Sequence, residues 1–272
     1  MSLLEWYGDI PIPHDGFIVP RWRAQALLRG KDVQILGDSL ARRLAATWFD
    51  FMEDVHVSTV EDVTLLGAET PHLLGRPVGV KGVSWTARYS NASVRNFDVM
   101  RAPHPLDICP KLRVEADVVV IALGVHCAIN AGALPRANLP DRHMLTRCVD
   151  QLRNTTGCLC RTKGSQQIIW RLAPFMWSPS EPSESNSINN LVHSFNQHVV
   201  RWRDNHCRQM VLVDGEALLK SRDVGKRRLA GDTVYHLSYP ARFAHVQAVL
   251  RSILGASMKK GTERPGGRRR TR

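Results

Sequence analysis

The sequence contains no long hydrophobic run. No segment of its 272 residues approaches the roughly 18 apolar residues that a membrane-spanning helix requires. Its first residues lack the basic start and apolar stretch of a signal peptide, so we expect a cytoplasmic protein, or a secretory one whose leader is absent here. It also lacks a Gly-x-Gly-x-x-Gly or Walker-type loop, so a nucleotide-binding or phosphate-binding function is the least favoured hypothesis.

A pair of cysteines with metal-ligand spacing is lacking. The six cysteines stand at positions 109, 127, 148, 158, 160 and 207. Cys158 and Cys160 are separated by one residue, too few for the usual pair of metal ligands, and no second pair accompanies them. We therefore expect no metal and no organic cofactor, and mostly buried or free thiols.

Positive charge is concentrated at the end of the chain. The formal net charge is +12, and residues 259–272 hold seven basic residues and one acidic residue, which gives 7 − 1 = +6. This glycine-containing stretch has almost no apolar residues, so we expect one domain over 1–257 and a disordered basic tail over 258–272. A solvated terminus is the favoured interpretation. A patch for anionic partners or targeting is the alternative, and nucleic-acid binding is not expected.

Apolar residues alternate between strand-like and helix-like patterns along the chain. This alternation predicts an α/β fold, in which a mainly parallel sheet carries helices on both faces. A surface loop is expected over Ser178–Ser187. Strands are expected at Val33–Leu36, Val83–Tyr89, Val118–Leu123, Ile168–Leu172 and Val211–Val213, and helices at Ala41–Met52, Met144–Leu152, Ile188–Trp202 and Phe243–Ile253.

The run Gly37-Asp38-Ser39-Leu40 lies between an expected strand and an expected helix. A turn of this kind exposes a serine hydroxyl, and the helix that follows directs its N-terminal amides towards developing negative charge. We therefore predict Ser39 as a nucleophile. Four residues recur by chance, so the prediction depends on a base elsewhere in the chain.

A histidine and an acid share one short segment late in the chain. Asp232 and His236 stand directly ahead of the last expected helix, an arrangement that can aim an imidazole and fix its tautomer. The spacing alone fits an unrelated loop histidine equally well, and His245 is the alternative base. For the oxyanion of acyl transfer, the donors we expect are the Ser39 amide, a glycine amide at Gly124 or Gly82, and the His126 side chain.

Taken in order, these segments resemble the SGNH/GDSL hydrolase superfamily, and within it the PC-esterase branch, which includes the trichome-birefringence-like polysaccharide O-acetyltransferases. The likeness spans about Ile10 to Leu254. It is carried by a Leu-Arg-Gly-Lys run leading through a strand into Gly37-Asp38-Ser39, with Arg42 three residues on. The strand that ends in Gly124-Val125-His126 and the late pair Asp232 and His236 complete it.

The resemblance implies a flavodoxin-like three-layer α/β/α sandwich. It assigns Ser39 as nucleophile, His236 as general base and acid, and Asp232 as the orienting carboxylate. It places Asp38, Arg42, Gly82, Gly124 and His126 among residues that hold the oxyanion or the substrate. The implied activity is hydrolysis or transfer of an O-acyl group, notably acetyl, from a small-molecule or glycan ester.

Two features of the sequence depart from the family pattern. Three residues separate Asp232 from His236 where the family has Asp-x-x-His, and His126 stands where many members have asparagine. The alternative is therefore an inactive SGNH-like binding module whose basic tail contacts anionic partners. Labelling of Ser39 by a fluorophosphonate distinguishes the two hypotheses.

Overall fold

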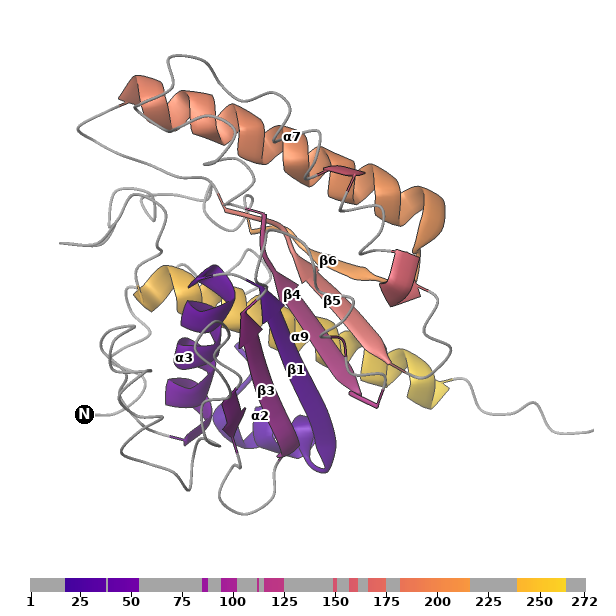
Figure 1. The fold of residues 1–272 in the computed structure, drawn as a ribbon. Helices are drawn as coiled ribbons and strands as arrows, with labels where there is room; N and C mark the ends of the chain where they lie inside the picture. Colours follow the sequence, from indigo (N-terminus) through magenta and orange to yellow (C-terminus); the bar gives the residue numbers. More distant parts are fainter. Residues whose placement is uncertain are drawn as a thin grey trace, which may run out of the picture.

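The structure is a computed structural model of the whole chain, and the elements that it places are shown in Figure 1. Residues 18–37, 39–53, 85–87, 94–101, 112, 115–124, 149–150, 157–160, 166–174, 182–215 and 239–262 are described. Of the helix expected over Met144–Leu152, only residues 149–150 are in this set, and both are helical.

Six strands form one sheet in the order β2-β3-β1-β4-β5-β6. Strands β3, β1, β4, β5 and β6 are parallel, and β2 pairs antiparallel with β3 at one edge. Without that edge strand, the sequence order across the sheet is second, first, third, fourth and fifth, which is the flavodoxin order. The expected mainly parallel, flavodoxin-like sheet is confirmed. The strands are β1 Lys31–Gly37, β2 Trp85–Ala87, β3 Val94–Arg101, β4 Val118–Ala122, β5 Gln167–Arg171 and β6 Val211–Val213.

Helices cover both faces of the sheet, which makes three layers (Figure 1). Successive residues of β4 point to opposite faces: Val118, Val120 and Ala122 enter one apolar cluster, whereas Val119 and Ile121 enter the other. A strand buried on both faces reads as a continuous apolar run, so β4 was recognisable from sequence. The first cluster includes α2 Arg21–Leu28, α3 Ser39–Glu53 and α9 Tyr239–Thr262, and the second includes α7 Pro182–His206 and the helical segment 157–160.

Helix α3 buries the stripe that its sequence predicts. Leu40, Leu44, Trp48 and Met52 recur every four residues and are all buried. Each large apolar side chain buried in this way contributes about 1.5–3 kcal/mol relative to its exposed state. Phe51, on the same helix, meets Phe243 of α9 edge to face, with the ring centroids 5.4 Å apart. This contact ties α3 to α9.

Helix α7 begins earlier than expected. Its first residue is Pro182, so Pro182–Ser187 belongs to the helix, and the expectation of a loop there was wrong. A proline suits the first turn of a helix, because its amide would have no intrahelical acceptor and its φ is already helical. The serine, proline and glutamate residues over 182–187 therefore form the start of a helix and not a loop.

Other boundaries also differ from expectation. Helix α9 continues to Thr262, so it includes the first residues of the stretch expected to be a disordered tail. Strand β3 and helix α2 had no clear sequence signal. In α2, only Ala24 and Leu28 are buried, so its residues show no continuous apolar stripe.

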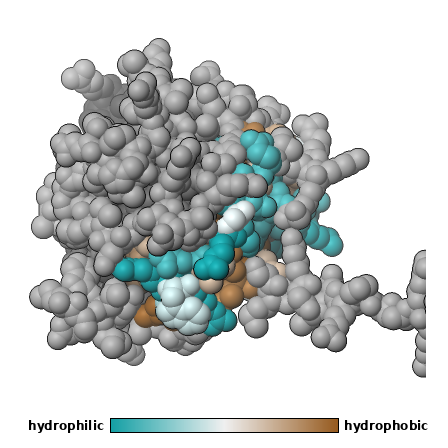
Figure 2. Space-filling view, turned by 90° about the horizontal axis from the view of Figure 1, so that it is seen from below, coloured by the Kyte–Doolittle hydropathy of each residue, from teal (hydrophilic) through white to brown (hydrophobic). Residues whose placement is uncertain are grey.

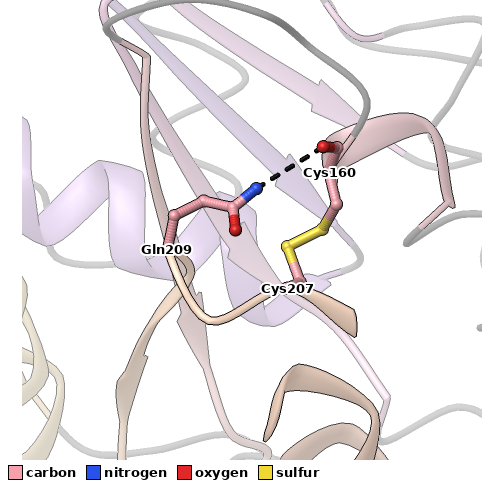
Figure 3. Close-up of a disulfide and its surroundings, with 3 residues drawn as sticks. All are labelled: Cys160, Cys207 and Gln209. Carbon is pink, nitrogen blue, oxygen red and sulfur yellow. Dashed lines mark hydrogen bonds between the residues drawn. A yellow bond between two sulfur atoms is a disulfide. The ribbon is translucent and has the colours of Figure 1, made fainter. Parts of the chain in front are cut away.

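Two cysteines expected as thiols form a disulfide. Cys160 bonds to Cys207 across 47 residues, with the Cα atoms 5.5 Å apart (Figure 3). Cys158 is disulfide-bonded as well. The side chain of Gln209 donates a hydrogen bond to the carbonyl of Cys160. The disulfide joins the segment before β5 to the residue after α7, so it lies at the amino ends of the strands. Sequence spacing could not reveal a pairing that the fold creates.

The view from below shows the described surface as mainly hydrophilic, with small hydrophobic patches between the polar residues (Figure 2). Trp22 of α2 is the large apolar side chain that is most exposed among the described residues, at 69%. Within the described part of the chain, no helix is both long enough and apolar enough to cross a membrane.

Candidate active site

The sequence-predicted site begins where the order of the strands reverses. Strand β1 has β3 on one side and β4 on the other, so the chain changes direction across the sheet between β1 and β4. In open parallel sheets, ligands bind at the carboxyl ends of the strands beside this point. Gly37 ends β1 and lies opposite Ala122 of β4, and Gly124 follows two residues later. The predicted Gly37–Ser39 turn and Gly124 therefore meet at this edge.

Gly37 allows β1, β4 and α3 to approach closely. A Cβ atom at this position would overlap the carbonyl oxygen of Ala122 and would lie 2.8 Å from the Cβ atom of Ala41. Real Cβ atoms do not approach other heavy atoms so closely. A glycine is therefore required for the chain to leave the strand and enter α3 directly.

Ser39 is the first residue of α3. The first amides of a helix have no intrahelical acceptor, and the helix dipole places partial positive charge at this end. The backbone of α3 therefore offers donors at the carboxyl edge of the sheet. Asp38 lies outside the described residues, and for Ser39 and Arg42 the structure describes the helical backbone and not the side chain.

Gly124 follows β4 at the same edge of the sheet. Its φ of +121° lies in a region that favours glycine, and a Cβ atom here would collide with the ring of Phe195 from α7. Phe195 is fully buried against the end of β4. The end of β4 is thus fixed by packing from the α7 face.

The other predicted site residues lie outside the described part of the chain. These are Gly82, His126, Asp232 and His236. Their roles stay predictions. The described chain does fix both ends of the segment that carries Asp232 and His236, because it stops at Gly215 after β6 and resumes at Tyr239, where α9 begins.

A buried polar pair that sequence reasoning did not anticipate stands at the same edge. Arg171 ends β5, His245 belongs to α9, and Nη1 of Arg171 lies 3.0 Å from Nδ1 of His245. The two residues are 1% and 0% exposed. A guanidinium can only donate, so Nδ1 accepts, and the proton of the neutral imidazole is on Nε2. Burial, followed by the positive charge of Arg171, holds the pKa of His245 well below its usual value.

In the described part of the chain, His245, the alternative to His236, has little access to a substrate proton. Its ring is fully buried, and Nδ1 already accepts from Arg171. Among the described residues, Nε2 has no hydrogen-bond partner. A general base must reach a proton on the substrate or nucleophile through a hydrogen bond or one water. The sequence gives no local signal for this pair, because 74 residues separate Arg171 from His245.

Gly215 packs against the edge of the same imidazole. A Cβ atom on Gly215 would lie 3.0 Å from Cε1 and 3.6 Å from Nδ1 of His245, and would overlap the carbonyl oxygen of Leu172. On the opposite face, the side-chain amide of Asn196 accepts from the Ala173 amide at 3.0 Å and donates to its carbonyl at 2.8 Å. The chain leaving β5 is therefore held from both layers of helices.

Within the described part of the chain, no group of three or more histidine, cysteine or acidic side chains is arranged to hold a metal ion.

No family model matches the chain, and no curated protein sequence matches it. Solved structures do. LAE5, an alpha/beta hydrolase enzyme from the metagenome of Lake Arreo in Spain, aligns with a TM-score of 0.50 and 16% identity, over 84% of this chain and 97% of its own. Axe2, an acetylxylan esterase from Geobacillus stearothermophilus, aligns with a TM-score of 0.48 and 16% identity, over 84% and 96%. At these identities the likeness concerns the fold.

Proposed function

We propose that this chain is a serine-dependent O-acyl esterase, with acetyl as the acyl group, in the PC-esterase branch of the SGNH hydrolases. The observation that supports this most directly is the position of Ser39. It begins α3 two residues after Gly37, which ends β1 beside the reversal of strand order and pairs with Ala122 of β4. This is where a parallel sheet presents a nucleophile to helix N-terminal amides.

The proposed reaction has two steps. Oγ of Ser39 attacks the acyl carbonyl carbon while His236 takes the serine proton, and the ester C–O bond breaks as His236 protonates the departing alcohol. Water then attacks the acyl carbon and passes a proton to His236. The bond between this carbon and Oγ of Ser39 breaks, His236 returns the proton to Oγ, and the acid is released. Asp232 orients His236. The amides of Ser39 and Gly124 stabilise the oxyanion, with Gly82, His126, Asp38 and Arg42 as further oxyanion or substrate contacts.

We propose acetylated glycans as the substrate class, on the strength of the family resemblance. If a sugar hydroxyl replaces water in the second step, the same acyl-enzyme gives an O-acetyltransferase. The first step is common to both outcomes. Product analysis with an acetylated xylo-oligosaccharide distinguishes them, because hydrolysis yields free acetate whereas transfer yields a newly acetylated sugar.

Fluorophosphonate labelling tests the nucleophile without knowledge of the substrate. Wild type should be labelled, Ser39→Ala should not, and Ser252→Ala should label as wild type does. Ser252 is a suitable control because its hydroxyl donates to the Ala248 carbonyl within α9. Equal labelling of wild type and Ser39→Ala would refute the assignment. No labelling of a folded wild type would favour the inactive binding module.

His236→Ala tests the proposed base. Members of a catalytic triad act as a unit, so its loss should reduce kcat on 4-nitrophenyl acetate by about 10³-fold or more, comparable with Ser39→Ala. His193→Ala is the matched control, since His193 is exposed on α7. A His236→Ala variant with wild-type kcat would show that another group is the base.

A further inference from the structure

One buried imidazole lies against residues at the ends of two strands and belongs to the helix that follows the proposed histidine segment. His245 is fully buried and belongs to α9, which begins at Tyr239, three residues after His236. Its Nδ1 accepts from Arg171 at the end of β5. Gly215, the last described residue before the segment 216–238, packs on its ring edge. His245 thus lies against the last described residue before this segment and is carried by the helix that follows it.

We infer that His245, held by Arg171, is a positioning residue for the proposed base His236. This inference rests on the proposed function. His245 does not touch the substrate in this role. It fixes the start of α9, which lies three residues after His236 in the sequence, relative to the ends of β5 and β6.

The chemistry of the pair suits this role better than an apolar contact would. Arg171 projects from the last residue of β5 onto the face that α9 covers, since its neighbour Trp170 enters the opposite cluster. Its hydrogen bond to a neutral ring has a defined direction, so it fixes the rotation of α9 as well as its distance from the sheet. Apolar contacts have no such direction, so they constrain the rotation of a helix against a sheet less strictly.

Gly215 adds a second constraint. Its lack of a Cβ atom lets the backbone lie against the imidazole and the Leu172 carbonyl. Leu172, in turn, donates its amide to the Val213 carbonyl at 2.9 Å. The ends of β5 and β6 and the first turns of α9 therefore form one rigid base. A larger side chain at position 215 would separate them.

The test compares four purified variants on 4-nitrophenyl acetate. His245→Phe keeps the ring shape and removes the acceptor. A misplacement of about 1 Å can cost about 10²-fold in rate, so kcat should fall about 10- to 100-fold while KM changes less than about threefold. His245→Asn restores an acceptor near Nδ1 and should recover most of the rate. Arg171→Met should match His245→Phe.

Ile253→Ala is the control for a merely structural effect. Ile253 is buried on the same helix, two turns beyond His245, in the apolar cluster. Its truncation should destabilise the protein about as much as His245→Phe does, and should leave kcat within about twofold at a temperature where both are folded. An equal fall in kcat for Ile253→Ala and His245→Phe would overturn the inference, as would wild-type kcat in His245→Phe.

Hydrogen exchange separates this inference from the proposed function. Amides in 216–238 should exchange faster in His245→Phe than in wild type, and Ile253→Ala should leave them unchanged. If wild type neither labels at Ser39 nor turns over the ester, the proposed function fails, and the exchange comparison alone decides the positioning role. Unchanged exchange in His245→Phe would overturn it.

Discussion

The carboxyl edge of the sheet has two halves that are built by different means. Around Ser39, the packing depends on small residues. Gly37 pairs with Ala122 and lies close to Ala41, and Gly124 has a positive φ. Around His245, a buried guanidinium and imidazole meet across 74 residues. The half around Ser39 depends on small residues that let the backbone approach closely, whereas the half around His245 depends on a specific pair of side chains.

This contrast explains what the sequence could and could not predict. Gly37, Ser39 and the flanking strand and helix are adjacent in sequence, so the succession of β1 and α3 was predicted from local pattern. The Arg171–His245 pair and the Cys160–Cys207 disulfide depend on tertiary contact and gave no local signal. The fold class followed from the alternation of strands and helices. Strand β3 was missed because its apolar residues are interrupted by Arg95, Asn96 and Asp98.

The largest predicted effect is in the half around Ser39. Gly37→Val places a branched side chain against the Ala122 carbonyl and Ala41. The backbone cannot move away without breaking the β1–β4 pairing, so we expect a loss of about 3 kcal/mol or more in unfolding free energy. Urea unfolding measures it. Gly255→Ala, where nothing lies within 4 Å of the added atom, should be neutral or stabilising. A stable Gly37→Val protein would contradict the close approach.

A loss of comparable size at the opposite end of the strands should leave both halves intact. Replacing Cys160 and Cys207 by serine removes a link across 47 residues, for which we expect about 2–4 kcal/mol of destabilisation. Ser39 labelling should be unchanged at a temperature where the variant is folded. Differential scanning calorimetry and labelling on the same sample measure the two effects. Loss of labelling in a folded variant would show that the disulfide is coupled to the site.

Gly124→Ala tests whether backbone strain also matters at the end of β4. Alanine is disfavoured at a φ of +121°, and its Cβ atom would collide with Phe195. We expect a loss of about 1–3 kcal/mol in unfolding free energy and a lower rate of Ser39 labelling. Adding Phe195→Leu should relieve the collision but not the strain at this φ, so the unfolding free energy should recover only in part. Complete recovery would show that the ring contact alone requires glycine.

The smallest effect is a pH dependence specific to the half around His245. His245 stays neutral in the folded protein because its pKa is lowered, whereas in the unfolded chain it takes up a proton below about pH 6.5. The unfolded state then binds more protons, so stability should fall as the pH drops below about 6.5. His245→Phe should show a smaller decrease between pH 7.5 and 5.5 in urea unfolding. An identical decrease in both proteins would contradict a buried neutral imidazole.

Capture of the acyl-enzyme tests the central claim most directly. Wild type and Ser39→Ala are mixed with 4-nitrophenyl acetate, quenched in acid within the first turnover and digested for mass spectrometry. We predict one acetyl group on Ser39 of wild type, which disappears with time, and none on the matching peptide of Ser39→Ala. Ester turnover by a Ser39→Ala protein at the wild-type rate, with acetyl on another residue, would contradict the assignment of Ser39 as the nucleophile.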